Sequence, residues 1–143
     1  MSSRDKNLNH LIDTIGSILT PKIGKVSDKP VEFAKLARTA FPFIAINIDS
    51  EDREDITMQH RLCTMYVGIT AHIQAAAKGN EANSQLNVIM EAIDKALEKD
   101  RTRGGNALLT ELREVNTIEE SNFPIVSLKH IYVIQYYHNR GNS

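Results

Sequence analysis

The spacing of apolar side chains predicts two amphipathic helices. Leucine and isoleucine recur every three or four positions between residues 4 and 19, as they do along one face of a helix. The pair Thr20-Pro21 ends this helix, because proline disfavours helical backbone in the residue before it. A second apolar stripe predicts a helix over residues 81–100, and the glycine pair that follows is typical of a helix end. A short helical turn is expected over residues 31–38.

The period of β-strands appears in four segments, residues 43–49, 59–74, 108–116 and 125–138. Phe-Pro pairs open the first and the last of them, a position where the missing N–H of proline costs least. The predicted order of elements is α-β-β-α-β-β. It indicates an α+β fold with helices packed on one face of a mostly antiparallel or mixed β-sheet. We expect a single domain over residues 1–143, with polar, frayed ends at about 1–4 and 139–143.

The second strand is unusually long for a chain of this size. Its sixteen residues would span roughly 50 Å, whereas a compact domain of this length has a diameter of roughly 35–40 Å. Two explanations are open. Gly68 marks a bulge or bend in the strand, or the strand projects from the domain and needs a partner. In either case we expect Met65, Val67 and Ile69 to face the core, because they lie on the more apolar side of the alternation.

Two charged segments are expected to be solvated loops. Residues 49–55 carry five acids and one arginine. A calcium loop of the EF-hand type is excluded there, because its sixth and twelfth positions would hold Glu54 and His60 in place of glycine and glutamate. The other segment, residues 21–30, contains three lysines.

The composition is typical of a folded protein with a net charge close to zero. The 143 residues are 41% hydrophobic and 24% charged, and the formal net charge is −1, so nothing draws the whole chain to nucleic acid or to an anionic membrane. The single cysteine cannot form an internal disulfide, and no apolar run is long enough to span a membrane. We therefore expect a protein of cytosolic origin that does not associate with membranes.

A search for chemistry finds no catalytic, cofactor-binding or metal-binding residues, so the chain is not expected to be an enzyme. The five histidines lack the spacing of a zinc site, although His72 and His130 could meet across a sheet. Cys63 lies within a β pattern on the more apolar face, where a thiol behaves as a small buried hydrophobe. No Gly-x-Ser-x-Gly elbow and no phosphate-binding glycine loop occur.

Charged residues of three segments are the candidates for contact with partners, either another protein or DNA, with plain solvation as the alternative. They are the acidic segment residues Glu51, Asp52, Arg53, Glu54 and Asp55, the loop residues Lys22, Lys25 and Lys29, and Arg101 and Arg103 after the second helix.

The order of elements resembles the tail terminator, or tail completion, proteins of long-tailed bacteriophages. Those proteins have an N-terminal helix, a strand opened by Phe-Pro, a long strand, a second helix and a last strand rich in tyrosine. The corresponding stretches here are residues 41–46, 62–73, 86–97 and 128–137, so the resemblance covers most of the chain, from about Leu8 to His138.

This resemblance implies a structural role in the virion and no cofactor. Family members form a homo-oligomeric ring, usually a hexamer, at the end of the tail tube. The ring binds the tail tube protein, ends tube polymerisation and joins the head-side connector, while DNA passes through the lumen without sequence-specific binding. Localisation would be the virion tail or neck, and the host cytoplasm during assembly. The alternatives are a stopper or adaptor protein of the head–tail connector, and a small ligand-binding protein or enzyme of the same fold class.

Overall fold

The computed structural model describes residues 3–18, 22–29, 38–56, 60–75, 79–120 and 123–139. These residues form two helices and five strands, together with a short 3-10 turn, η2, at Arg38–Ala40. In chain order the main elements are α1 (Ser3–Gly16), β1 (Lys25–Ser27), β2 (Phe43–Asp55), β3 (His60–Gln74), α2 (Asn80–Glu98), β4 (Leu109–Val115) and β5 (Ile125–Asn139). Of the helical turn predicted over 31–38, all but Arg38 lies outside the described residues.

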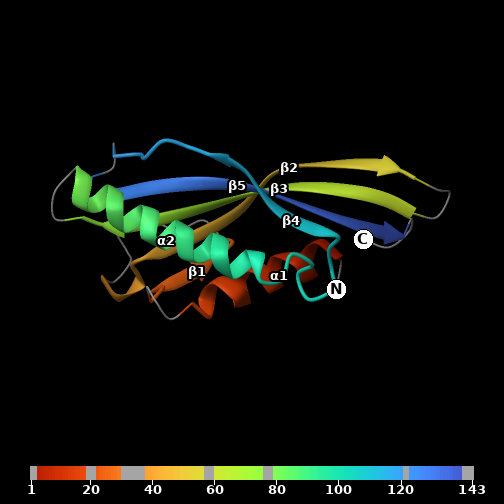
Figure 1. The fold of residues 1–143 in the computed structure, drawn as a ribbon, viewed down its shortest axis with the longest axis horizontal. Helices are drawn as coiled ribbons and strands as arrows, with labels where there is room; N and C mark the ends of the chain where they lie inside the picture. The colour runs from red at the N-terminus through yellow and green to blue at the C-terminus, as the bar shows by residue number, and fades with distance from the viewer. Residues whose placement is uncertain are drawn as a thin grey trace.

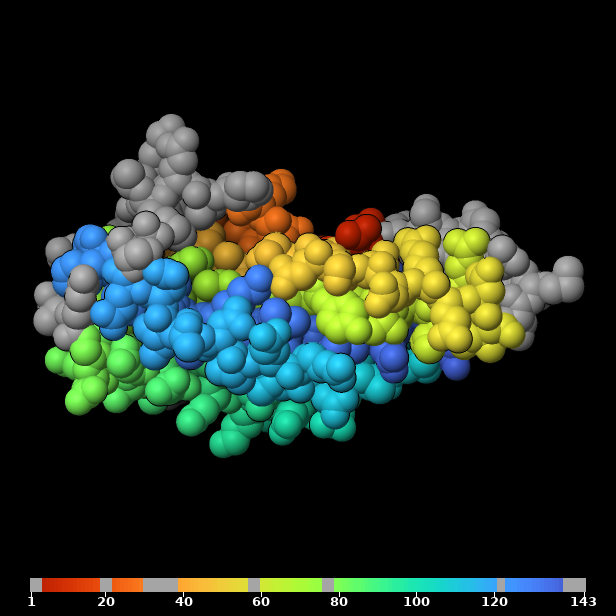
Figure 2. All heavy atoms as spheres, turned by 90° about the horizontal axis from the view of Figure 1, so that it is seen from above, coloured from red at the N-terminus to blue at the C-terminus, as the bar shows by residue number. Residues whose placement is uncertain are grey.

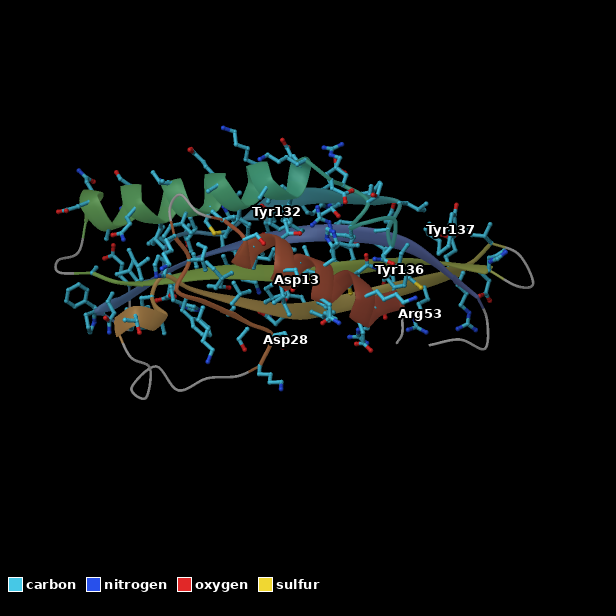
Figure 3. All side chains as sticks on the ribbon, turned by 90° about the horizontal axis from the view of Figure 1, so that it is seen from below. Asp13, Asp28, Arg53, Tyr132, Tyr136 and Tyr137 are labelled. Atoms are coloured by element: carbon cyan, nitrogen blue, oxygen red, sulfur yellow. The ribbon has the colours of Figure 1, made fainter. Side chains whose placement is uncertain are left out.

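The five strands form one mixed sheet in the order β1-β2-β3-β5-β4. All neighbouring pairs are antiparallel except β1 with β2, which is parallel. Both helices lie on the same face of the sheet, and none of the described residues forms a helix over the other face (Figures 1 and 3). The predicted α+β class with helices on one face is therefore confirmed.

The predicted order of elements was incomplete, because it placed a loop where β1 forms. Three strands, not two, separate α1 from α2. β1 has only three residues, Lys25–Ser27, and Val26 is its one apolar residue, so no periodicity could reveal it. It exists because its backbone pairs with residues Phe43–Ala45 of β2, a tertiary contact that no local pattern reports.

The core lies between the sheet and the helices and is apolar in its main part. The stripe predicted on α2 is buried, and Leu86 and Ile93 have no exposed surface. On β3, Met65, Val67 and Ile69 are fully buried, as expected from the alternation. The same side of β5 adds residues such as Ile134.

The acidic segment is not a loop but the second half of β2. Residues 50–55 pair in antiparallel register with β3, ending with Asp55 opposite Arg61. The prediction failed here because these residues are polar on both sides of the strand, which hides the period of two. Strand pairing satisfies the backbone regardless of the side chains, so β2 continues six residues beyond its predicted end.

Gly68 does not mark a bulge in β3. The register of β3 with β5 runs without interruption from His60 to Gln74. The irregularities lie in other strands, at Asp49 in β2 and at Arg113 in β4. Of the two explanations for the long strand, a bulge at Gly68 is therefore wrong.

Candidate assembly surface

One end of the sheet extends beyond both helices, and we call it the distal arm (Figure 1). It consists of residues 49–55 of β2, 60–64 of β3 and 135–139 of β5. β1 pairs only with the start of β2, and the pairing of β4 with β5 ends at Gln135. Within the described residues, both outer edges of the arm therefore lack a neighbouring strand over most of its length. Unpaired strand edges carry free N–H and C=O groups that can pair with another chain.

The helix side of the arm holds a polar network in place of an apolar core. The Glu51 carboxylate is only 10% exposed, and it accepts hydrogen bonds from the Tyr136 hydroxyl and from Arg53 Nη2 at 3.3 Å. Arg4 Nη1 of α1 lies 4.0 Å from the same carboxylate. In Figure 3, Arg53 and Tyr136 lie close to the start of α1. Burial, followed by the hydrogen bond and negative charge of Glu51, raises the pKa of Tyr136, so the phenol stays protonated as the donor.

Cys63 lies under this network and is fully buried. Burial raises the pKa of its thiol, with Arg53 and Glu51 acting in opposite directions as smaller causes. A protonated, inaccessible thiol is a poor nucleophile. Cys63 therefore packs as an apolar side chain, as its position in the strand pattern suggested.

The helix-free side of the arm carries exposed acids beside exposed apolar groups. Asp52 and Glu54 point to this side, because side chains alternate along β2 and Glu51 faces the helices. Glu54 lies opposite Leu62, and Leu62 opposite Tyr137, which is 52% exposed. Ile56, at the end of β2, is 50% exposed. Sequence reasoning missed these apolar residues, because their exposure depends on where the arm ends.

The lysine candidates lie at the opposite end of β2. Lys22, Lys25 and Lys29 are all exposed, within or beside β1. β1 pairs with Phe43–Ala45, whereas the acidic candidates occupy the last five residues of β2. The structure therefore brings the two predicted groups onto the same edge of the sheet but not into contact.

Arg103 is not a surface residue, which corrects its selection as an interface candidate. Its side chain is fully buried, and Nη2 donates to the carbonyl of Leu97 at 2.6 Å and to that of Asp100. Nε donates to Thr110 Oγ1 at 3.0 Å. Arg103 thus satisfies carbonyls at the end of α2, which have no partner within the helix. Arg101, two residues earlier, remains exposed.

His72 and His130 do not meet across the sheet, a possibility that the sequence left open. His72 lies opposite Ser127, and its Nδ1 is 2.5 Å from Ser127 Oγ. Burial lowers the pKa of His72 to about 4, which makes the imidazole a weak base at neutral pH. The backbone N–H of Ser127 donates to the carbonyl of Glu119, so it cannot stabilise an oxyanion. This pair therefore lacks two requirements of a serine nucleophile.

Within the described ranges, no group of three or more histidine, cysteine, aspartate or glutamate side chains could hold a metal ion. None of the described helices has the length and apolar character needed to cross a membrane. The most distinctive feature is therefore the distal arm, with its open edges and its separate acidic and apolar groups. The sequence matches no family model and no curated protein.

Proposed function

We propose that this protein is a structural subunit that assembles with its own copies into a ring, and that this ring is a bacteriophage tail terminator. The observation that carries the proposal is the distal arm. Three strands extend beyond the helices, and the described residues leave both edges of the arm unpaired over most of its length. Such edges are suited to contact with a neighbouring subunit.

The side chains of the arm favour binding to one specific partner and oppose non-specific aggregation. Charged residues on an edge strand oppose pairing with arbitrary chains. The exposed acids Asp52 and Glu54 supply such charges, while Leu62 and Tyr137 beside them offer apolar surface. A specific interface needs both features, an apolar centre and a polar rim.

The tail-terminator assignment adds to this geometry the resemblance in element order. A ring of this kind would cap the tail tube, end its polymerisation and join the head-side connector, and none of these tasks requires an active site. Its partners would be the tube protein and the connector, with DNA passing through the lumen.

The test measures mass and tube length. Six copies of a 16.0 kDa chain have a mass of about 96 kDa, which mass photometry distinguishes from a monomer. We expect a ring either for the protein alone or after addition of tail tube subunits, and we expect tube growth to stop with the ring at one end. A monomer that neither binds the tube nor limits its length would overturn the proposal. Binding to connector protein but not to the tube would identify a stopper or adaptor instead.

A further inference from the structure

Two surfaces of opposite charge lie on the same edge of the sheet, about 30 Å apart. The first is the acidic tip, defined as Asp52 and Glu54 near the end of β2. The second is the lysine segment, defined as Lys22, Lys25 and Lys29 around β1. Nine residues of β2 separate the strand partners of β1 from Glu54, which gives the distance at about 3.3 Å per residue. Figure 2 shows β2 running along one margin of the helix-free face between these two ends.

The acids of the tip differ from the other acids of β2, which form ion pairs within the chain. Asp49 pairs with Lys129 at 3.1 Å, and Asp55 pairs with Arg61 at 2.8 Å. Glu51 pairs with Arg53 on the helix side. Asp52 and Glu54 are exposed, and no described residue forms an ion pair with either. Their two negative charges are therefore available to a partner.

The lysine segment is similarly unneutralised. All three ammonium groups are exposed, and none forms an ion pair with an acid in the described part of the chain. Within one copy the two surfaces are too far apart to attract each other, because salt screens charges beyond about 8 Å at physiological ionic strength. Only a second copy can bring the acidic tip to a lysine segment.

A contact between two different surfaces leaves one of each free on every pair, so it repeats from copy to copy. Such heterologous contacts produce a ring when the rotation closes and a filament when it does not. The apolar side chains of Leu62 and Tyr137 beside the tip, and of Ile56 beyond it, provide area to bury at the same contact. The unpaired edge of β2 lies between the two charged surfaces.

We infer that the acidic tip of one copy docks on the lysine segment of the next copy, and that this head-to-tail contact builds the ring. The inference rests on the proposed function and names the surfaces that perform it. Charge attraction determines which surface of one copy meets which surface of the next. The apolar residues beside the tip then stabilise the contact.

The test reverses the charge of each surface in a separate variant and then mixes the two variants. The tip variant is Asp52→Lys with Glu54→Lys, and the segment variant is Lys22→Glu with Lys29→Glu, both outside the paired part of β1. We expect each variant alone to need about tenfold or more protein for half-assembly, because like charges now face each other. An equimolar mixture of the two variants should assemble again, since each tip then finds a segment of opposite charge.

Rescue by mixing separates a lost contact from a lost fold, because misfolded chains would not recover on mixing. The matched control, Glu91→Lys with Glu98→Lys, reverses two exposed acids of α2 and should assemble as the unaltered chain does. If the unaltered chain assembles and the reversed variants assemble equally well, or if mixing restores nothing, the inference fails while the proposed ring stands. If the unaltered chain never assembles, even with tube protein, the proposed function itself fails.

Discussion

The two ends of this sheet use the same three strands but are held together by different forces. In the body, under the helices, β3 and β5 face α2 with apolar residues such as Ile69 and Ile134, which have no exposed surface. In the distal arm, the same side of the sheet carries Glu51, Arg53 and Tyr136, joined by hydrogen bonds. Hydrophobic burial therefore shapes the body, whereas a polar network positions the arm.

This difference has a consequence for assembly. An apolar arm of three exposed strands would bind many chains without selection, since exposed flat edges promote aggregation. A polar network holds the three strands of the arm in place with fewer apolar side chains. It leaves the few exposed apolar groups, including Tyr137, next to charges that restrict which surface can approach.

The largest effect on stability is expected for a substitution in the body. Leu86 of α2 is fully buried against the sheet, so Leu86→Ala removes apolar contacts and leaves a cavity. We expect the free energy of unfolding to fall by about 2–5 kcal/mol. Urea denaturation followed by circular dichroism measures it. The neighbouring exposed position offers a control, because Val88→Ala, at 54% exposure, should change stability by less than about 0.5 kcal/mol.

A smaller loss in the free energy of unfolding is expected for Tyr136→Phe, a substitution in the arm. The substitution keeps the ring but removes the hydroxyl that donates to Glu51, so a carboxylate that is only 10% exposed loses a donor. Arg53 still donates to Glu51, so the expected cost is that of one hydrogen bond to a charged group, about 1–3 kcal/mol. Tyr137→Phe, one residue later and half exposed, is the matched control and should be almost neutral. Equal effects of the two substitutions would show that the network does not hold the arm.

The contrast between the two ends also explains how much of the structure the sequence could predict. In the body, one side of each strand is apolar, so the period of two is visible, and Met65, Val67 and Ile69 were correctly placed in the core. In the arm, the buried side of β2 consists of Glu51 and Arg53, which look like solvated residues in a sequence. The pattern ended at the bulge at Asp49, and so did the predicted strand.

The candidate site was predictable only in part for the same reason. The acidic and lysine residues are visible as charge runs, but their positions on one sheet edge depend on β1, which is too short to predict. Arg103 was misassigned, because a lone arginine after a helix resembles any exposed base. Only the fold shows that the helix end and Thr110 surround it.

Lowering the pH should weaken the body near His72. Burial holds the pKa of this imidazole at about 4 in the folded chain, against 6.5 ordinarily. Between these values the unfolded chain binds the proton and the folded chain does not, so stability falls as the pH is lowered. We expect His72→Gln to reduce the drop in melting temperature between pH 7 and pH 5 by about 5 °C. Some drop should persist, because burial also lowers the pKa of His130.

The smallest effect is expected at Gly68, where body and arm meet. A Cβ at this position would lie 2.5 Å from Lys129 Cε, and Lys129 reaches over the glycine to pair with Asp49 at the bulge of β2. Gly68→Ala must push this flexible side chain aside, at a cost of about 0.2–1 kcal/mol for a partly exposed ion pair. It also removes the unfavourable entropy of glycine in a strand, a gain of roughly 0.5–1 kcal/mol.

The two contributions to Gly68→Ala nearly cancel, so the informative measurement is a double-mutant cycle. In a Lys129→Ala background the ion pair is already absent, and Gly68→Ala should stabilise the protein by about 0.5–1 kcal/mol. In the unaltered background the change in the free energy of unfolding should be within about 0.5 kcal/mol of zero. A cost of about 2 kcal/mol in both backgrounds would instead mean that the glycine is needed by the backbone.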